Sequence, residues 1–383
     1  MAEMLPYWRL SGFYFCYFAL LGGVAPFLSL YFHHLGFSAA RIGELVAIPM
    51  LMRCFAPVLW GWLGDRSGQR LLIVRLGALL TALTFTGILW RQDYLWLALI
   101  MALHSFFWHV VLPQFETITF GHLGEQSARY SRIRLWGSVG FIVTVVVLGL
   151  LLDRFSPAIY PQAMLSIMLA IFCCSLLVPP APVAATRSAL PGDGFLRQLW
   201  RPGVLVFFFS AGLMQLSHGP YYTFLTLHLE ALGYDRVLIG AMWALGVVAE
   251  IILFMVMSVI LARFSLKQLL IGSFILAALR WLLLGFWADS LVLLALAQVM
   301  HAATFGCFHV VAVHFVQRSF AERYQGQGQA LYATLSGCGG ALGALYSGYS
   351  WNALGAGWTF ALASVAATLA ALLLLRWMPG RAS

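Results

Sequence analysis

The stretch Gly61–Arg70 reads GWLGDRSGQR and carries three charged residues, Asp65, Arg66 and Arg70, between two long apolar runs. The run before it spans 42–62 and the run after it spans 71–90. Each is close to the roughly twenty residues that a helix needs to cross the hydrocarbon core of a bilayer. A short charged loop between two such runs predicts a pair of membrane-spanning helices.

The composition of the whole chain agrees with a membrane protein. Apolar residues make up 62% of the 383 residues and charged residues only 9%, whereas charged residues approach a quarter of an ordinary soluble protein. The net charge of +9 could indicate nucleic acid or a membrane surface as a partner. The charges lie in short loops between apolar runs, however, and form no single patch, so we expect no nucleic-acid partner.

Twelve apolar runs follow one another along the chain. Backbone groups cannot remain unpaired in lipid, so these runs are expected to be helices, and the first is too long for a signal peptide. The sequence therefore predicts an all-α membrane protein with twelve transmembrane helices, near 10–33, 42–62, 71–90, 94–118, 134–153, 159–179, 204–229, 238–261, 268–287, 291–315, 327–350 and 357–377.

The basic residues predict the orientation of these helices. Alternate loops place sixteen Lys and Arg on one side and four on the other, and two arginines lie inside spans. Because basic loops stay in the cytoplasm, both termini are predicted to be cytoplasmic.

The two halves of the chain resemble each other. Pro179–Pro202 is rich in Pro, Gly and Ala, as linkers are. It predicts a six-helix half at 1–180, a linker at 181–203 and a second half at 204–383. FLSLYFHHLGFSAARIG from Phe27 aligns without gaps on FLTLHLEALGYDRVLIG from Phe224, a shift of 197 residues with seven of seventeen positions identical. We therefore expect two pseudo-symmetric halves.

The charged stretch carries a family resemblance. It resembles the pattern G-x-L-a-D-r-x-G-r-r of the major facilitator superfamily of secondary transporters. That resemblance implies a twelve-helix fold with two repeats around a midplane site, and a loop that controls conformation. Asp65 is expected to lie at a helix N-terminus or to pair with an arginine, and its second-half equivalent is Ala262. The expected conformational gate comprises Gly61, Asp65, Arg66, Gly68 and Arg70.

Charged residues inside spans are costly in hydrocarbon and indicate function. Arg53 lies about 16 Å into its span at 1.5 Å per residue, and the 197-residue shift places Glu250 at the equivalent depth. The alternative is a structural ion pair, or two separately neutralised groups. Arg280 and His301 lie within the spans that follow Glu250. Burial favours a protonated acid and a nearby arginine favours its carboxylate, so Glu250, Arg280 and His301 are predicted to couple transport to protons.

A second pair of charges lies in the first half. Glu116 closes one span and Arg134 opens the next. By length alone both are interfacial, although Pro113 could tilt Glu116 inward. The P-x-x-E segment and the Arg134 segment resemble the substrate-binding pair of the lactose permeases, and Arg280 and His301 match their coupling residues. The chain departs from them in two places. The coupling carboxylate of the lactose permeases maps near Val247, and Glu250 lies one turn away. Their second carboxylate maps to Thr304.

The bacterial phenylpropionate permeases resemble the chain more closely, over nearly its whole length. The matching segments include MRCF at Arg53, RLWGSV at Arg134–Val139, LGVVAE at Leu245–Glu250, and His301. A further match is a histidine followed by paired tyrosines, His218, Tyr221 and Tyr222. The resemblance implies proton symport of an aromatic acid.

The remaining polar residues predict no cofactor or metal. The six cysteines lie in apolar runs and suit small hydrophobic positions. His104, His109, His309 and His314 line a cavity or are packed, and the sequence HVV recurs at His109 and His309. The glycines of Gly337–Gly343 favour close helix packing.

The chain is therefore expected to be a transporter and not an enzyme, since it has neither a sizeable soluble region nor a nucleophile–base motif. It also has no P-loop, which excludes an ATP-driven pump. Our interpretation is proton-coupled import of a small organic acid such as an aromatic carboxylate. The alternatives are a sugar or nucleoside symporter and a drug or metabolite efflux antiporter. The residues expected to bind substrate are Arg53, Glu116, Arg134, Tyr221 and Tyr222.

The expected surroundings follow from this function. We expect a multi-pass protein of the bacterial inner membrane, acting as a monomer. Its partners are expected to be the lipid bilayer, protons and a small-molecule substrate.

Overall fold

The structure is a computed structural model that describes residues 5–181 and 193–378, most of which are helical. The chain divides into two compact units. Unit 1 contains Met1–Arg187 and Asp235–Ala241, and unit 2 contains Ser188–Tyr234 and Met242–Ser383. Residues 182–192 of the predicted linker lie outside the described residues, and Asp193–Leu199 form a short helix, α7. The division into 1–180, 181–203 and 204–383 stays a prediction.

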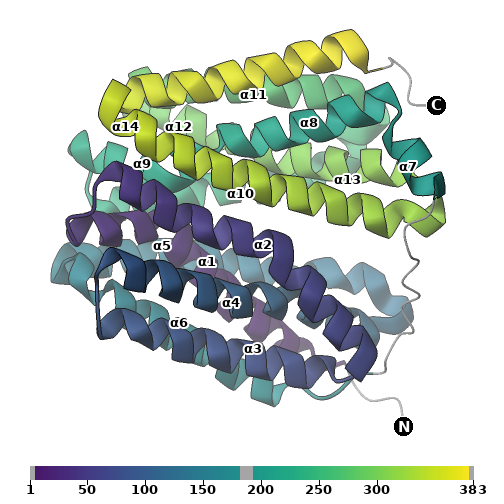
Figure 1. Cartoon of the computed structure of the whole chain (residues 1–383), viewed down its shortest axis with the longest axis horizontal. Coiled ribbons are helices and arrows are strands. Elements are labelled where there is room, and N and C mark those ends of the chain that lie inside the picture. Colours follow the sequence, from purple (N-terminus) through teal and green to yellow (C-terminus); the bar gives the residue numbers. More distant parts are fainter. Residues whose placement is uncertain (1–4, 182–192, 379–383) are drawn as a thin grey trace. The chain divides into compact units, whose positions relative to one another are not determined.

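Unit 1 is a bundle of long antiparallel helices (Figure 1). Within it α1 packs against α5 and α6, and α3 packs against α4. The six helices are α1 (Tyr7–His34), α2 (Ala39–Ser67), α3 (Arg70–Phe85), α4 (Tyr94–Leu123), α5 (Tyr130–Phe155) and α6 (Tyr160–Leu177).

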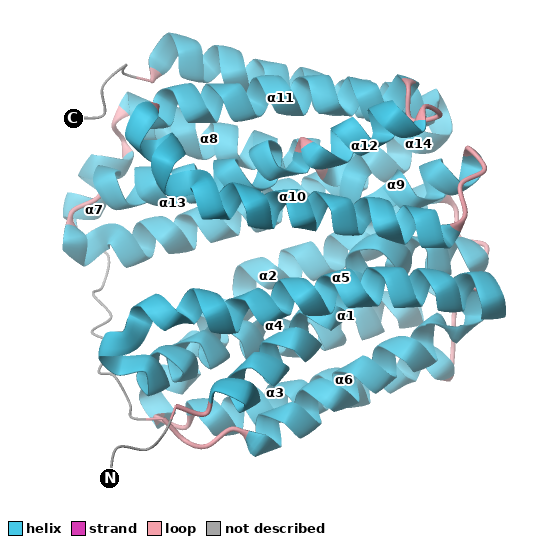
Figure 2. Cartoon of the chain, turned by 180° about the vertical axis from the view of Figure 1, so that it is seen from behind, coloured by secondary structure: helices cyan, strands magenta, loops and turns pink. Residues whose placement is uncertain are grey.

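Unit 2 has the same type of bundle, but two of its spans are interrupted (Figure 2). The first span breaks at His218, because the following Gly219–Pro220 lacks one backbone donor. Another contains a widened π-helical stretch, Ala302–Cys307. The helices are α8 (Pro202–Ser217), α9 (Gly219–Ala231), α10 (Arg236–Arg263), α11 (Leu266–Phe286), α12 (Leu291–Val299), α13 (Phe308–Ser319) and α14 (Gln325–Trp377).

The helices account for the predicted spans. Nine helical stretches of the described residues are long and apolar enough to cross a membrane. Two of them contain two spans each: Tyr94–Phe155 holds α4 and α5, and α14 reverses at Gly355, whose φ is 81°. The interrupted pair α8 and α9 forms one more span. The prediction of an all-α protein with twelve transmembrane helices is confirmed.

The repeat predicted from Phe27 and Phe224 has a structural signature. Gly36 follows α1 with a φ of 85°, and Gly233 follows α9 with a φ of 89°. Both conformations are left-handed and favour glycine. The paired LG residues of the alignment therefore end equivalent helices in the same way.

The charged stretch 61–70 is less of a loop than expected. Helix α2 continues to Ser67, so that Asp65 and Arg66 belong to its last turn. The connection to α3 is only Gly68 and Gln69, where Gly68 has a φ of 68°. The apolar run ends at 62 because the last turn of α2 emerges from hydrocarbon, whereas the helix itself is ended by the left-handed glycine.

Small residues bring helices close together within each unit. A Cβ atom on Gly22 of α1 would lie 2.8 Å from the carbonyl oxygen of Phe141 on α5. One on Gly343 of α14 would lie 2.7 Å from the carbonyl oxygen of Leu216 on α8. Glycine at these positions permits the close backbone approach that is typical of membrane helices.

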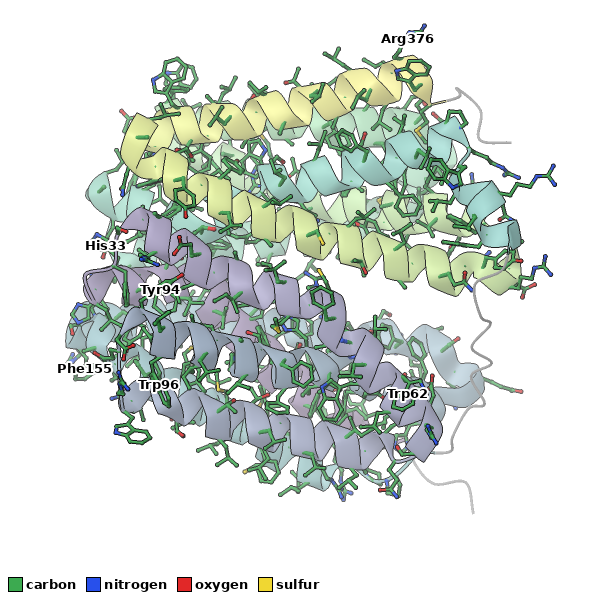
Figure 3. The ribbon with its side chains drawn as sticks, viewed as in Figure 1. His33, Trp62, Tyr94, Trp96, Phe155 and Arg376 are labelled. Carbon is green, nitrogen blue, oxygen red and sulfur yellow. The ribbon has the colours of Figure 1, made fainter. Side chains whose placement is uncertain are left out.

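Exposed aromatic side chains lie near both ends of unit 1. Trp62 is at one end of the bundle and Phe155 at the other (Figure 3), and both are more than half exposed. Aromatic residues are enriched at the two interfaces of a membrane, so this placement agrees with helices that span it.

Candidate functional site

The predicted proton-coupling residues come together in unit 2. We call Tyr221, Glu250, Arg280, His301 and Thr304 the arginine–histidine cluster. His301 lies where α12 gives way to the π-helical stretch, and its Nε2 is 3.8 Å from Oε2 of Glu250 on α10. The histidine is 6% exposed. A carboxylate and an imidazole at this distance can share or exchange a proton through a small movement.

Arg280 anchors this cluster from α11. Its guanidinium is fully buried. Nε donates a hydrogen bond to the Ala297 carbonyl oxygen (2.8 Å), and Nη1 donates to Oγ1 of Thr304 (3.0 Å). The guanidinium also lies over the Tyr221 ring, 4.2 Å from its centroid. A buried arginine with neutral partners places a fixed positive charge beside the titratable groups.

Tyr221 completes the cluster from α9. Its ring stacks on His301 with the centroids 5.6 Å apart, and its hydroxyl donates to Oε1 of Gln298 (2.9 Å). Tyr222 adds a second ring 5.1 Å from that of Tyr221, and Trp243 on α10 a third at 4.6 Å. These rings pack together beside the charged groups, and Tyr221 and Trp243 are almost fully buried.

The broken helices position this cluster. Because Pro220 has no N–H, α8 ends at Ser217, and Nδ1 of His218 bonds the Met214 carbonyl oxygen (2.8 Å). The π-helical stretch widens the turn between His301 and Thr304, and π-helical turns inside α-helices are frequent at functional sites. Both irregular turns lie next to residues of the cluster.

Unit 1 holds a second polar cluster. We call Tyr14, Glu116, Thr119, Tyr130 and Arg134 the tyrosine–glutamate cluster. Tyr130 donates its hydroxyl proton to Oε1 of Glu116 (2.9 Å), and Tyr14 donates to Oγ1 of Thr119 (3.2 Å). The guanidinium of Arg134 lies 3.6 Å from the centroid of the Phe18 ring. Glu116 and Arg134, predicted to act as a pair, thus lie in one neighbourhood.

Arg53 lies near the middle of α2, and Tyr17 of α1 lies within reach of its charge and of the charges of Glu116 and Arg134. The Arg53 charge also acts on His109 of α4. The Arg53 side chain is exposed within the structure. It therefore has room to meet a ligand of opposite charge.

The predicted gate residues form a network at the end of α2. Arg70 pairs with the Asp65 carboxylate, which is one of the two arrangements expected for this aspartate. Nη1 of Arg70 also donates to Oε1 of Gln114 on α4 (2.8 Å), and Nε2 of Gln114 donates to the Trp60 carbonyl oxygen (3.3 Å). Arg66 lies over the Trp62 ring. This network ties α2, α3 and α4 together.

The sequence did not point to several members of the clusters. Tyr14 and Tyr130 look like ordinary aromatic residues in the sequence, and Gln298, which accepts a hydrogen bond from Tyr221 of the arginine–histidine cluster, is a single polar residue inside an apolar span. Its position three residues before His301 was the available signal, since a buried amide needs a partner. Among the described residues, no group of three or more His, Cys, Asp or Glu is placed to hold a metal ion.

Long apolar helices in two repeated bundles, with charged clusters buried inside them, define a multi-pass membrane protein of the transporter class. The chain belongs to the MFS_1 like family, whose model matches residues 7–362. The family predicted from Gly61–Arg70 is confirmed.

Known relatives agree with this class. The chain is 28% identical over 368 residues to a probable 3-phenylpropionic acid transporter of Escherichia coli K12, covering 92% of this chain and 94% of the relative. It is 26% identical over 342 residues to the maltose permease of Geobacillus stearothermophilus, covering 88% and 86%. The crystal structure of the nucleoside transporter NupG has the same fold, with a TM-score of 0.84 at 20% identity, covering 97% of this chain and 99% of that one.

Proposed function

We propose that the chain is a secondary active transporter that imports a small organic acid, such as an aromatic carboxylate, together with protons by alternating access. The observation that carries the proposal is the Glu250–His301 pair beside the fixed charge of Arg280. A carboxylate whose proton can pass to a neighbouring imidazole, next to a cation, is suited to loading and unloading one proton in each cycle.

The substrate class is inferred from the chemistry of both units. Arg53 and Arg134 in unit 1 offer positive charge, and Tyr221 and Tyr222 in unit 2 offer ring surface. We assign substrate binding to these four residues and Glu116. The name of the Escherichia coli relative agrees with an aromatic acid.

A sugar or nucleoside is the second candidate, because the relatives include a maltose permease and nucleoside permeases. An aromatic ring such as that of the half-buried Tyr222 suits a sugar or a base as well as a phenyl group. Uptake of 3-phenylpropionate, maltose and a nucleoside into proteoliposomes separates the candidates. If only maltose or only the nucleoside shows saturable uptake, that compound replaces the organic acid as the proposed substrate. An outward-directed flux driven by inward protons would indicate an efflux antiporter instead.

We also propose the setting of this activity. The protein acts as a monomer in the bacterial inner membrane, with both termini in the cytoplasm. The distribution of basic residues supports this orientation.

Replacing Arg53 by Gln should weaken binding of the carboxylate substrate. A charged hydrogen bond contributes about 1.5–3 kcal/mol, which corresponds to about ten- to hundredfold in Kd. The measurement is the Kd of 3-phenylpropionate for the purified protein. Arg41→Gln on the same helix is the matched control, because Arg41 already pairs with Glu44 at 3.2 Å. Unchanged affinity in Arg53→Gln for every substrate found would exclude Arg53 as the anion-binding residue.

Replacing Asp65 by Asn should slow transport and leave binding intact. The Asp65–Arg70 pair is partly exposed, and such a pair contributes about 1 kcal/mol. A bias of that size changes the ratio of two conformations about fivefold. The initial uptake rate and the Kd are measured together, with the exposed Glu125→Gln as control. A loss of affinity equal to the loss of rate would argue against a conformational role.

A further inference from the structure

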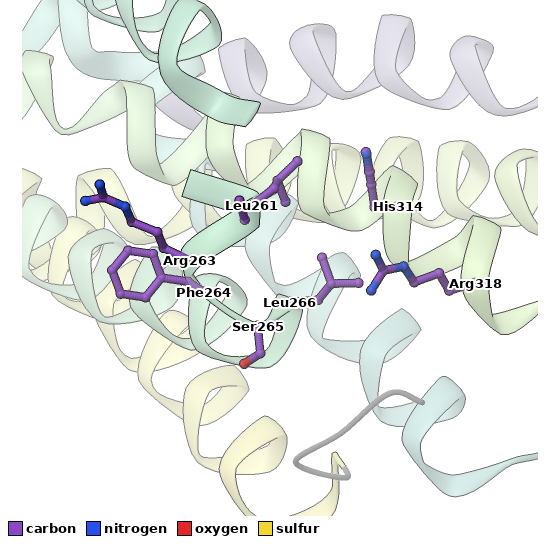
Figure 4. Close-up of a pocket in the computed structure, with 8 residues that line it drawn as sticks. Leu261, Arg263, Phe264, Ser265, Leu266, His314 and Arg318 are labelled. Carbon is purple, nitrogen blue, oxygen red and sulfur yellow. The ribbon is translucent and has the colours of Figure 1, made fainter. Parts of the chain in front are cut away.

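Unit 2 has a pocket at the end of the bundle where α10 and α13 finish (Figure 4). Its volume is about 330 Å³. It is bounded by the turn between α10 and α11, including Ala262 and Ser265, and by His314 and Arg318 of α13. By the proposed orientation this end faces the cytoplasm.

In the internal repeat, the position of this pocket in unit 2 is equivalent to that of the Asp65–Arg70–Gln114 network in unit 1. The 197-residue shift places Ala262 at the position of Asp65. The HVV repeat continues as HVVxxxF, with Phe115 and Phe315 equivalent, and its 200-residue shift places His314 at the position of Gln114. Unit 2 therefore lacks the carboxylate around which the network of unit 1 is built.

The cations of the two units are also placed differently. Lys267 is the equivalent of Arg70, but its Nζ donates to the Leu375 carbonyl oxygen at the end of α14 (3.2 Å). Arg318 supplies positive charge to the pocket instead, and the equivalent residue of unit 1 is the buried Ile118. Where unit 1 holds an aspartate with its arginine, unit 2 offers an arginine and no acid.

The polar groups of the pocket have unused hydrogen-bonding capacity. Both ring nitrogens of His314 are buried without a hydrogen-bond partner. Among the residues that the structure describes, no carboxylate lies within 4.0 Å of Arg318. The Ser265 hydroxyl is already engaged with Gln268 in the cap of α11. Arg318 is therefore the charged group that a ligand in the pocket would meet, and the His314 side chain lines the wall beside it.

Their spacing suits an oxyanion. His314 and Arg318 are four residues apart on α13, and hence on one face of the helix. Figure 4 shows Arg318 directed towards Leu266, with Arg263 on the other side of the turn. The fork of a guanidinium binds two oxygens of a phosphate at once. Both ring nitrogens of His314 are closed off from solvent, so the imidazole can donate to another oxygen only after its ring turns.

We propose that this pocket binds a phosphate group, which takes the structural place of the Asp65 carboxylate and ties α10 to α13. The group is carried by an anionic lipid headgroup or is free in solution. The volume exceeds that of phosphate alone, and the pocket lies at the end of the spans, where headgroups are found. This inference does not depend on which substrate is transported.

The test measures thermal unfolding of the purified full chain. Inorganic phosphate is compared with chloride at matched ionic strength, and mixed vesicles of phosphatidylcholine and phosphatidylglycerol with phosphatidylcholine alone. A ligand that binds only the folded state should raise the unfolding temperature by a few degrees. A response to inorganic phosphate supports a free anion, a response to phosphatidylglycerol alone supports a headgroup, and no response to either overturns the proposal.

Variants of the pocket show whether the rise in unfolding temperature comes from binding at this site. Arg318→Gln should abolish it, whereas Arg376→Gln, an exposed arginine of α14, should retain it. Ala262→Asp gives unit 2 a carboxylate equivalent to that of Asp65. This variant should also lose the response to phosphate, because the new carboxylate competes with phosphate for Arg318. Native mass spectrometry provides a second readout, in which the wild type retains one phosphatidylglycerol more than Arg318→Gln if the ligand is a headgroup. A wild-type response in Arg318→Gln, or in a folded Ala262→Asp, would overturn the proposal.

Discussion

Uphill accumulation of substrate should disappear in the Glu250→Gln variant, whereas exchange of substrate across the membrane should persist. Glutamine imitates the protonated acid permanently, so the cluster can no longer release a proton. Exchange requires no net proton movement and therefore survives. With the membrane potential held at zero, one proton per substrate across one pH unit supports about tenfold accumulation, because a tenfold ratio corresponds to about 1.4 kcal/mol.

The measurement uses proteoliposomes with valinomycin and equal potassium concentrations inside and outside, and with the outside one pH unit more acidic than the inside. At early times the wild type is expected to approach the roughly tenfold ratio, whereas Glu250→Gln should follow the slower uptake of protein-free vesicles, because passive entry of the neutral acid reaches the same ratio only at equilibrium. Counterflow of labelled substrate serves as the control for folding and binding. His301→Ala should shift the pH dependence of transport without abolishing binding. Accumulation by Glu250→Gln would show that this residue is structural, and Glu116 would become the candidate for the proton site.

Loss of the buried cation should be comparably severe. Arg280→Met removes hydrogen bonds to the Ala297 carbonyl and to Thr304. Each charged hydrogen bond contributes about 1.5–3 kcal/mol, so their combined loss should lower the uptake rate at least about a hundredfold. Because the hydrogen-bond partners of Arg280 are neutral, Met removes the buried charge without leaving an opposite charge of a hydrogen-bonded ion pair behind. The variant is therefore expected to remain folded and to lose transport.

Initial uptake rates, with size-exclusion profiles of the purified variants, test this expectation. Arg376→Met is the matched control, since Arg376 lies exposed at the end of α14 (Figure 3). Arg280→Lys retains the charge without the planar fork that meets both partners, so its rate should fall between those of the wild type and Arg280→Met. If a folded Arg280→Met variant transports at the wild-type rate, Arg280 has no role in transport beyond stabilising the structure.

Local signals in the sequence were sufficient for the fold. Apolar runs of span length predict helices whatever their neighbours, and the LG pairs at Gly36 and Gly233 predict equivalent helix ends, which the structure confirms. The end of α2 was predicted less well. Hydropathy marks where a helix leaves the hydrocarbon, whereas the helix itself continues until Gly68 turns it.

The clusters were predictable only in part. Glu250, Arg280 and His301 were grouped because charges inside spans are rare, and the Glu250–His301 distance agrees with that grouping. The contacts of Tyr130 with Glu116, and of Gln298 with Tyr221, depend on how each helix is rotated about its axis. Periodicity is weak in helices that are apolar on every face, so the sequence alone does not specify that rotation.

Proton movement during substrate entry tests the central claim most directly. A pH-sensitive dye enclosed in proteoliposomes reports the internal pH after 3-phenylpropionate is added outside, and protein-free vesicles serve as the control for passive entry of the acid. We predict an additional acidification that saturates with substrate concentration and is absent in Glu250→Gln. Saturable uptake of labelled substrate by the wild type, with no more acidification than protein-free vesicles show, would contradict proton coupling.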